Sequence, residues 1–388
     1  MLTLLRNAFV YAPALLGHRD LLLGGGRVLW IGTTAPELPH ALAVDVVDLQ
    51  GARLIPGLID GHVHLTGGGG EAGLHTKVPA PTLSDYTVGG VTTAIGVLGT
   101  DDCTRSPSEL VTAARSLEAE GLSAWCHTGG YHVPPVTLTG SIRSDIVHID
   151  RIIGVGEVAI SDHRSSQPTL DELLRIASEA HVAGLMTGKA GIMHLHVGDG
   201  TRGLELIRRA LAASELPARV FNPTHVNRRK ALFEEALALA ATGCTVDITA
   251  FPVAQDEDAW SAADALLRYL DSGAPETRVT VSSDGGGCLP VFDHEGRVAS
   301  MDVGRSRALA ATLHELLTRG LPLERILPAF TSNVAALLRL PHKGRIDVGA
   351  DADLVVLDDA GHVHDVMARG VWQMRGGVLQ RLGTFEQR

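Results

Sequence analysis

Cysteine is scarce and scattered in this sequence. The 388 residues contain four cysteines, at positions 103, 126, 244 and 288, and no two of them form a C-x-x-C pair. This spacing argues against a thiolate zinc site and gives no disulfide framework. We therefore expect reduced thiols, as in a cytoplasmic protein.

Other absences narrow the class of protein further. Aromatic residues make up only 4% of the chain, and no run of 18 apolar residues predicts a membrane span. Arg6 and Asn7 interrupt the apolar N-terminus, so no signal-peptide core is expected. The formal net charge of −11 argues against a nucleic-acid partner. We expect neither nucleic acid nor a membrane among its partners.

What is present falls into two kinds of region. Residues 1–51 and 345–388 contain short apolar runs separated by Gly and Pro, which predict β-strands. Residues 52–344 alternate apolar strands with helices. Eight segments are strand candidates: 54–59, 92–98, 123–127, 152–160, 192–197, 219–225, 244–251 and 278–283. Helices are expected between most of them, at 108–120, 170–183, 201–213, 228–241 and 303–319.

The number and order of these segments predict the fold class. Eight β/α units favour an α/β protein with a (β/α)8 TIM-like barrel over 52–344, and an open doubly wound sheet is the alternative. Both chain ends together are expected to form a small β-sandwich domain, 1–51 and 345–388. Thr169 with Glu172 is a capping-box pattern that starts one helix, and we expect that helix to end at Gly184.

Histidines gather near the ends of the predicted strands. His62 and His64 follow an apolar strand at spacing i, i+2, so both rings face the same side and can reach one metal ion. His196, His225 and Asp284 close three further strand candidates. Barrel enzymes carry their catalytic groups at that end of the strands. Imidazoles and carboxylates without thiolates suit zinc or a similar divalent metal. His194 shares a face with His196, and we prefer His196 because it lies nearer the strand end.

Several segments resemble a known family. The matching segments read PGLIDGHVHLTGGGGEAG (56–73), GVTTAIGVLGTD (90–101), HTGGYHVP (127–134), AISDHRS (159–165), HLHVGD (194–199), PTHVNR (223–228), SSDGGG (282–287) and GRIDVGADADLVVLD (344–358). Together they resemble the isoaspartyl dipeptidases of the metal-dependent amidohydrolase superfamily. The resemblance implies a homo-oligomeric hydrolase that cleaves β-aspartyl dipeptides with a hydroxide held by two zinc ions.

The resemblance also implies roles for particular residues. His62, His64 and Asp284 would hold one zinc ion, and His196 and His225 the other. Asp284 would accept the proton of the attacking hydroxide and pass it to the departing amine. Tyr131 resembles the residue that donates a hydrogen bond to the developing oxyanion.

A small zwitterionic dipeptide offers one ammonium group and two carboxylates for recognition. Glu71, in a glycine-rich loop, is suited to the ammonium, and Arg164 and Arg228 are suited to the carboxylates. Thr100, after the second strand, is expected to add a hydrogen bond.

Two positions depart from the family pattern. Glu157 stands where a carboxylated lysine usually bridges the metals, and we expect its two oxygens to bridge them instead, with a single-metal or degenerate site as alternatives. Cys288 replaces a serine that contacts a substrate carboxylate, and a thiol is the weaker hydrogen-bonding group.

These departures keep other functions open. A cyclic-amide hydrolase similar to dihydroorotases and hydantoinases, or an N-acyl amidohydrolase, is the enzymatic alternative. A metal- or ligand-binding relative without activity is the non-enzymatic one.

Overall fold

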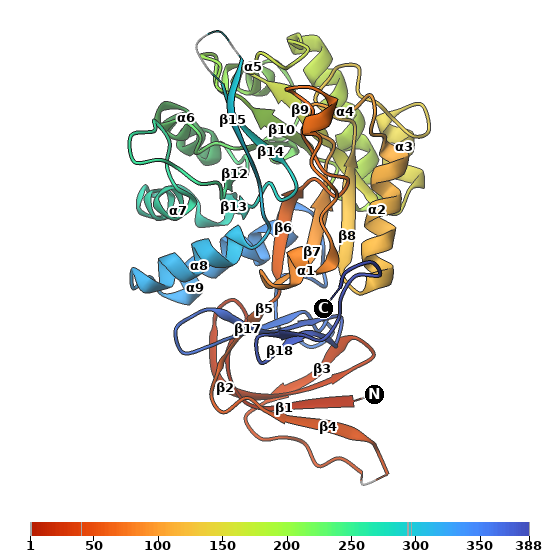
Figure 1. Cartoon of the computed structure of the whole chain (residues 1–388), viewed down its shortest axis with the longest axis vertical. Helices are drawn as coiled ribbons and strands as arrows, with labels where there is room; N and C mark the ends of the chain where they lie inside the picture. The colour runs from red at the N-terminus through yellow and green to blue at the C-terminus, as the bar shows by residue number, and fades with distance from the viewer. Residues whose placement is uncertain (1, 40, 293–294, 296, 388) are drawn as a thin grey trace.

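The chain folds into a barrel with a smaller β-sheet below it (Figure 1). The computed structural model describes residues 2–39, 41–292, 295 and 297–387. The N-terminal and C-terminal strands lie together in the smaller sheet, and the middle of the chain forms the barrel (Figure 1).

Eight parallel strands form the barrel within the described residues. They are β6 (Leu58–Val63), β7 (Val91–Gly96), β8 (Ser123–Thr128), β9 (Ile152–Ile160), β10 (Met193–Val197), β11 (Phe221–Thr224), β12 (Val246–Thr249) and β13 (Val279–Ser282). The first six pair in sequence order, and β12 pairs with β13. Backbone bonds from Val226 to Asp247 (3.3 Å) and from His64 to Gly285 (2.8 Å) connect these two groups into a ring. The expected (β/α)8 barrel is confirmed.

The helices largely follow the expected segments. They are α1 (Leu83–Thr87), α2 (Pro107–Glu120), α3 (Ile142–His148), α4 (Leu170–Thr187), α5 (Glu205–Ala213), α6 (Lys230–Ala241), α7 (Ala262–Asp271), α8 (Ala308–Thr318), α9 (Leu323–Ile326) and α10 (Ser332–Leu337). Their buried faces are rich in Leu, Ile and Ala, which pack against the strands in one continuous core. No helix in the described part of the chain is long and apolar enough to cross a membrane.

Helix α4 begins at the predicted residue but ends later than its first glycine indicates. Its capping box between Thr169 and Glu172 forms as expected. The predicted end at Gly184 is wrong, because α4 continues to Thr187 and Gly188 takes the left-handed cap position. Gly184 lies inside the helix, where a Cβ atom would approach the Gly191 Cα to 2.6 Å. Close backbone packing, and not helix termination, explains this glycine.

The small sheet draws on both chain ends. Its strands are β1 (Leu2–Tyr11), β2 (Leu15–Gly24), β3 (Arg27–Gly32), β4 (Val44–Asp48), β5 (Arg53–Pro56), β16 (Leu354–Leu357), β17 (Val363–Ala368), β18 (Val371–Arg375) and β19 (Val378–Leu379). They form one mixed sheet in the order β19-β18-β17-β16-β5-β1-β2-β3, with β4 beside β1. Strands from both ends share one hydrophobic core.

The first predicted strand is divided between the two sheets. We expected one strand at 54–59, but β5 pairs with β16 in the small sheet and β6 starts the barrel. Gly57 separates them and donates its N–H to the Asp353 carbonyl (2.8 Å). A Cβ atom at Gly57 would lie 2.2 Å from the Thr92 hydroxyl, so the chain crosses where only glycine fits. The exact domain boundaries at 51/52 and 344/345 stay a prediction.

A buried ion cluster joins the two sheets at the N-terminal end of the barrel. The Lys343 ammonium lies 2.6 Å from the Ser123 hydroxyl, 2.6 Å from Asp353 and 2.8 Å from Asp351. Ser123 opens β8, and Asp353 directly precedes β16. All three ammonium hydrogens therefore have an acceptor.

Candidate metal centre and active site

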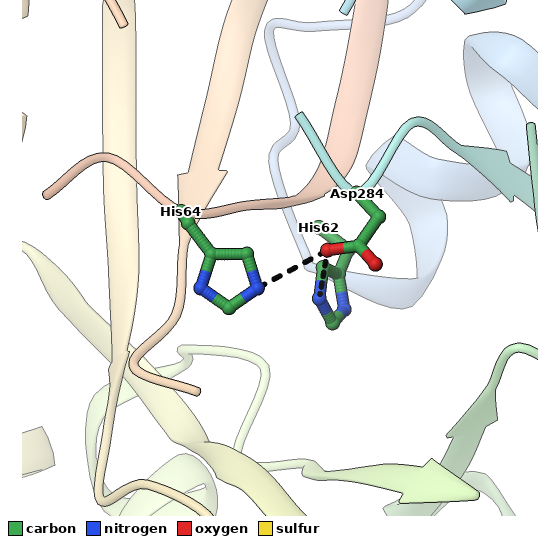
Figure 2. A group of neighbouring side chains, drawn as sticks. All are labelled: His62, His64 and Asp284. Carbon is green, nitrogen blue, oxygen red and sulfur yellow. Dashed lines mark ion pairs between the residues drawn. The ribbon is translucent and has the colours of Figure 1, made fainter. Parts of the chain in front are cut away.

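The predicted metal-binding residues meet at the C-terminal end of the barrel. His62 and His64 come from the end of β6, and Glu157 and His196 from β9 and β10. His225 directly follows β11, and Asp284 lies two residues after the end of β13. Figure 2 shows how one Asp284 oxygen faces both imidazoles of the first pair. Its Oδ1 lies 3.1 Å from His64 Nε2 and 3.5 Å from His62 Nε2.

Glu157 occupies the middle of this cluster. Its Oε1 lies 3.5 Å from His64 Nε2, and its Oε2 lies 3.5 Å from His62 Nε2, 3.3 Å from His196 Nδ1 and 3.6 Å from His225 Nε2. The two carboxylate oxygens therefore face different histidines. Two buried groups of ligand atoms share His62: His62, His64 and Asp284, and His62, Glu157 and His225. Glu157, together with the shared His62, thus connects both sides of the cluster.

Unpaired atoms show that a divalent metal fits here. His62 Nε2, Glu157 Oε2 and Asp284 Oδ1 are buried without a hydrogen-bond partner in the described structure. Buried polar atoms that lack partners are costly, and these atoms all lie on facing sides of one small space. Nitrogen and carboxylate donors in this number are what a divalent cation of the zinc class takes.

Two of these residues have unusual backbone conformations. His225 (φ 62°) and Asp284 (φ 53°) both adopt the left-handed region shortly after a strand ends. Residues other than glycine rarely do so, and such conformations concentrate at functional sites. A Cβ atom at Gly287 would lie 2.2 Å from Asp284 Oδ1, so this glycine leaves room for the carboxylate.

A chain of hydrogen bonds below the cluster fixes the ring of His62. Its Nδ1 lies 2.7 Å from His194 Nε2, and His194 Nδ1 lies 2.7 Å from Asn222 Oδ1. His194 therefore supports a ligand from one layer deeper, and His196 is the one that faces Glu157. Thr249 does the same for His225, with its hydroxyl 2.7 Å from Nδ1. The i, i+2 spacing correctly predicts that His194 and His196 share a face of β10. The sequence does not predict that His194 contacts His62 and Asn222 on neighbouring strands.

Asp162, within the segment 159–165, holds the side chains of two predicted site residues, His196 and Arg164. Its Oδ2 lies 3.0 Å from His196 Nε2, and its two oxygens accept hydrogen bonds from Arg164 Nε (3.0 Å) and NH2 (2.7 Å). An acceptor at Nε2 places the ring hydrogen there and turns the Nδ1 lone pair toward Glu157. The Tyr131 hydroxyl lies 2.7 Å from that Nδ1.

The electrostatics of the cluster are dominated by its carboxylates. Burial alone lowers the pKa of His62, but the charges of Glu157 and Asp284 raise it to about 9. Burial also raises the pKa of Glu157, yet His62, His196 and His225 hold it well below its usual range. His127, stacked on His194 in the layer below, has a pKa lowered to about 3 by burial. Burial likewise lowers the pKa of His225 to about 3, so the raised pKa is a property of His62, which faces both carboxylates.

A cavity of about 170 Å³ opens above the cluster. The residues expected to bind substrate all line it: Glu71, Thr100, Arg164, Arg228 and Cys288. Tyr131 and Asp284, expected to act in catalysis, line it as well. Glu71 Oε1 accepts a hydrogen bond from the Thr100 hydroxyl (3.1 Å) and lies 3.4 Å from Arg164. Its buried Oε2 has no hydrogen-bond partner in the described residues.

The other side chains of the cavity differ in how firmly they are held. Arg228 donates to the Val197 carbonyl (3.2 Å) beside His196. Cys288 is half-buried, and burial together with Glu71 and Asp284 raises the pKa of its thiol to about 12, so it stays neutral at pH 7. Gly68 N–H donates to the Gly286 carbonyl (2.8 Å), which brings the glycine-rich loop against the segment that carries Cys288.

Comparison with known proteins agrees with this geometry. Residues 53–373 match the Amidohydrolase family. A crystal structure of the beta-aspartyl dipeptidase from Fervidobacterium islandicum AW-1, in complex with beta-Asp-Leu dipeptide, is 43% identical, with a TM-score of 0.94 and coverage of 100% of this chain and 99% of that one.

Other similar proteins share less of their sequence with this chain. The dihydropyrimidinase from Brevibacillus agri NCHU1002 is 17% identical, with a TM-score of 0.66 over 99% of this chain and 97% of that one, which shows the fold alone. A deacetylase from Agrobacterium fabrum is 25% identical over 360 residues, 87% of this chain and 78% of the relative. The chain belongs to the amidohydrolase family, and within it is a homologue of the beta-aspartyl dipeptidases.

Proposed function

We propose that this protein hydrolyses the amide bond of β-aspartyl (isoaspartyl) dipeptides at a centre of two divalent metal ions, with zinc as the preferred metal. The observation that carries the proposal is the buried cluster of unpaired ligand atoms directly below a cavity with charges of both signs. The similarity to a dipeptidase over the full length of the chain supports it.

The residues of this chain would hold the metals in two sets. His62, His64 and Asp284 form one set, His196 and His225 form the other, and Glu157 connects them with its two oxygens. Bound there, the metals would acidify a water molecule and polarise the scissile carbonyl.

Asp284 and Tyr131 would act on the reacting atoms. Asp284 is ionised, since its contacts with His62 and His64 outweigh burial and hold its pKa well below the usual range. It would accept a proton as water attacks and deliver that proton to the leaving amine. The Tyr131 hydroxyl would donate to the oxygen of the former carbonyl; its pKa, raised by burial and by Glu157, keeps this proton in place.

The charged groups of the cavity would orient the dipeptide. The unpaired Oε2 of Glu71 would accept from the substrate ammonium. Arg164 and Arg228 would each bind a carboxylate, and Thr100 and Cys288 line the same cavity as weaker hydrogen-bonding groups. Arg164 is positioned in advance by Asp162, so little side-chain freedom is lost on binding.

One experiment tests the substrate and the metal together. Purified protein is analysed for bound metals and then assayed with β-Asp-Leu, α-Asp-Leu, a cyclic amide and an N-acetyl amino acid. We expect two metals per chain and hydrolysis of β-Asp-Leu alone. The cyclic amide and the N-acetyl amino acid offer no free ammonium to Glu71, and in α-Asp-Leu the scissile bond lies one carbon nearer to the ammonium, which shifts it relative to the metals. Opening of the cyclic amide or deacetylation, without cleavage of β-Asp-Leu, would reject the proposal. The family likeness also leads us to expect a homo-oligomer, which light scattering tests.

A further inference from the structure

Asp60 is a fully buried carboxylate on strand β6 that has no role in the proposed reaction. It lies two residues before His62, inside the barrel wall. A buried carboxylate is costly unless hydrogen bonds compensate for the lost water, so its partners show what it stabilises. Its oxygens accept hydrogen bonds from Ser283, which directly follows β13 and precedes Asp284.

Two hydrogen bonds join Asp60 to Ser283. The Ser283 N–H donates to Asp60 Oδ1 over 3.0 Å, and the Ser283 hydroxyl donates to Asp60 Oδ2. Each carboxylate oxygen thus accepts one bond, and Ser283 is held by its backbone and by its side chain at the same time. Any shift of Ser283 away from β6 would leave buried polar groups without partners, which is unfavourable.

The Ser283 hydroxyl extends this support past Asp284. It accepts a hydrogen bond from the Gly285 N–H over 2.9 Å, and the Gly285 carbonyl accepts one from the His64 N–H over 2.8 Å. The chain at β6 therefore holds this segment on both sides of Asp284, through the Asp60 side chain before it and the His64 backbone after it. Because the same stretch of chain carries both imidazoles of the first metal-binding set, these contacts fix the carboxylate relative to both rings.

The turn at Asp284 needs such support, because its backbone is strained. Its φ of 53° lies in the left-handed region, which is unfavourable for residues other than glycine. The Asp284 carbonyl accepts the Gly287 N–H (2.9 Å), and the Gly287 carbonyl accepts the Gly304 N–H (2.9 Å) at the base of the hairpin of β14 (Cys288–Phe292) and β15 (Val298–Val303). Without the contacts from β6 the turn would relax and carry the carboxylate away from the two imidazoles that it faces in Figure 2.

We propose that Asp60 is a positioning residue, which acts through Ser283 to hold the strained turn of Asp284 so that its carboxylate faces His62 and His64. This inference rests on the proposed function, in which Asp284 binds metal and carries a proton from water to the leaving amine. It adds the side chain that keeps this proton carrier in place.

Two variants weaken this support in different ways. Asp60→Asn keeps the size of the side chain but replaces one acceptor oxygen with an amide group that only donates, so one Ser283 donor faces another donor. Ser283→Ala removes the hydroxyl that contacts both Asp60 and Gly285, and it leaves the backbone bond to Asp60 in place. If both residues act through one chain of contacts, the double variant should lose much less activity than the product of the two single losses.

The leaving group distinguishes positioning of Asp284 from a general loss of structure. Metal-saturated protein is assayed with β-Asp-Leu and with β-aspartyl p-nitroanilide, whose weakly basic leaving amine departs without the proton that leucine needs. We expect Asp60→Asn to lower kcat for β-Asp-Leu by about 30-fold and kcat for the anilide by about fivefold less than that. KM for β-Asp-Leu should stay within about twofold of wild type, because the contact is needed in the transition state.

Metal affinity gives a readout that does not depend on turnover. Asp284 is a predicted metal ligand, so its displacement should weaken binding. We expect zinc to bind Asp60→Asn about tenfold more weakly than wild type in a chelator competition, as for other residues that orient a ligand.

Asp145→Asn is the matched control. Asp145 on α3 is as buried as Asp60, and it also accepts backbone N–H groups, from Leu138 (2.9 Å) and Thr139 (2.7 Å), together with hydroxyl groups. Among the described residues it makes no contact with the segment 283–285. This variant should lose stability and keep both the wild-type metal affinity and the wild-type ratio of the two kcat values.

The outcomes separate this inference from the proposed function. Equal falls in kcat for the two substrates, or wild-type metal affinity in Asp60→Asn, overturn the positioning role. If Asp60→Asn does not fold, Ser283→Ala provides the same two measurements and should shift both in the same direction. Wild-type protein that hydrolyses neither substrate overturns the proposed function, and the metal competition then still decides whether Asp60 positions Asp284 as a ligand.

Discussion

The two ends of the barrel each bury a cluster of charges, and the two clusters are built in opposite ways. At the N-terminal end, Lys343 is matched by Ser123, Asp351 and Asp353, so that each ammonium hydrogen has its acceptor. At the C-terminal end, His62, Glu157 and Asp284 keep buried atoms without partners. The first cluster is complete within the chain, and the second is complete only with a cation. Stability and chemistry are thus placed at different ends of one set of strands.

The largest effect should come from the incomplete cluster. Asp284→Asn removes a metal ligand and the proposed proton carrier, so we expect kcat for β-Asp-Leu to fall by roughly 10⁴-fold. Metal-free Asp284→Asn should unfold at a lower temperature than metal-free wild type at pH 6, because Asp284 is one of the charges that hold the proton on His62. Retention of more than a tenth of the wild-type kcat would remove Asp284 from the mechanism.

A substitution in the Lys343 cluster should lower the stability of the fold and leave catalysis unchanged. Lys343→Met leaves the buried carboxylate of Asp353 without its cation, while the half-buried Asp351 keeps Arg27 at 3.9 Å, and we expect the free energy of unfolding in urea to drop by about 3 kcal/mol. Metal content and KM of the folded fraction should match wild type. Lys189→Met is a matched control, since the Lys189 ammonium donates to the neutral carbonyls of Ile146 and Ile149 and forms no ion pair within the described residues, so its loss should cost about 1 kcal/mol. Equal losses in both variants would contradict the comparison.

Asp162 sharpens the comparison, because it lies at the C-terminal end of the barrel and contacts the predicted ligand His196 without being a predicted ligand itself. Asp162→Asn should weaken metal binding by about 10–100-fold in a chelator competition, since the ring of His196 loses its acceptor. KM should rise at the same time, because Arg164 loses its bidentate partner. Asp102→Asn is the control: Asp102 pairs with His132 at the same end of the barrel and contacts neither His196 nor Arg164 in the described structure. Metal affinity equal to wild type in Asp162→Asn would assign Asp162 to Arg164 alone.

The pH dependence of the metal-free protein distinguishes the clusters further. The pKa of His62 is raised to about 9 in the folded chain, above its unfolded value, so protonated His62 stabilises the fold below about pH 6.5 and this contribution is lost as pH rises through about 9. Metal-free protein should therefore melt at a lower temperature at pH 9.5 than at pH 6. Metal binding must displace that proton, so metal affinity should increase with pH over the same range. A melting temperature of the metal-free protein that rises from pH 6 to pH 9.5 would contradict this assignment.

The smallest effect concerns the four thiols. Burial raises the pKa of Cys126 to about 12 and that of Cys244 to about 11, whereas Cys103 is exposed. At pH 8, a thiol reagent should label Cys103 within minutes and leave Cys126 and Cys244 unlabelled until the protein unfolds. Cys288 should react slowly, and a bound β-Asp dipeptide should slow it further. Mass spectrometry of the labelled peptides measures all four rates.

The sequence predicted the barrel because each strand is a short apolar run and each helix carries local start and stop signals. It predicted the cluster in the same way, since His62, His196, His225 and Asp284 lie at or just beyond the strand ends, where parallel strands converge. The two expectations that failed, the end of α4 and the undivided first strand, both concern glycines. Gly184 is required by packing against Gly191 in the loop that follows α4, and Gly57 by packing against Thr92 on strand β7.

Supporting residues escaped sequence reasoning for a related reason. Asp162 and Asn222 are ordinary polar residues near strand ends, and their importance depends on which ring nitrogen they face. That orientation follows from three-dimensional contact between neighbouring strands. The structural role of Lys343 could not be predicted from the sequence either, because its partner Ser123 is 220 residues away in the chain.

The pairing of β5 with β16 has a consequence for how the molecule forms. Arg53 and Leu357 are partners in that ladder, so the centre of the small sheet joins segments made at the start and near the end of synthesis. Closing so large a loop is entropically unfavourable until the intervening barrel has drawn its ends together. Strands β1, β2 and β3 pair with neighbours in sequence, whereas β5 lacks its β16 partner until the last barrel strand has been synthesised. The small sheet therefore cannot be completed before the whole barrel sequence has been made.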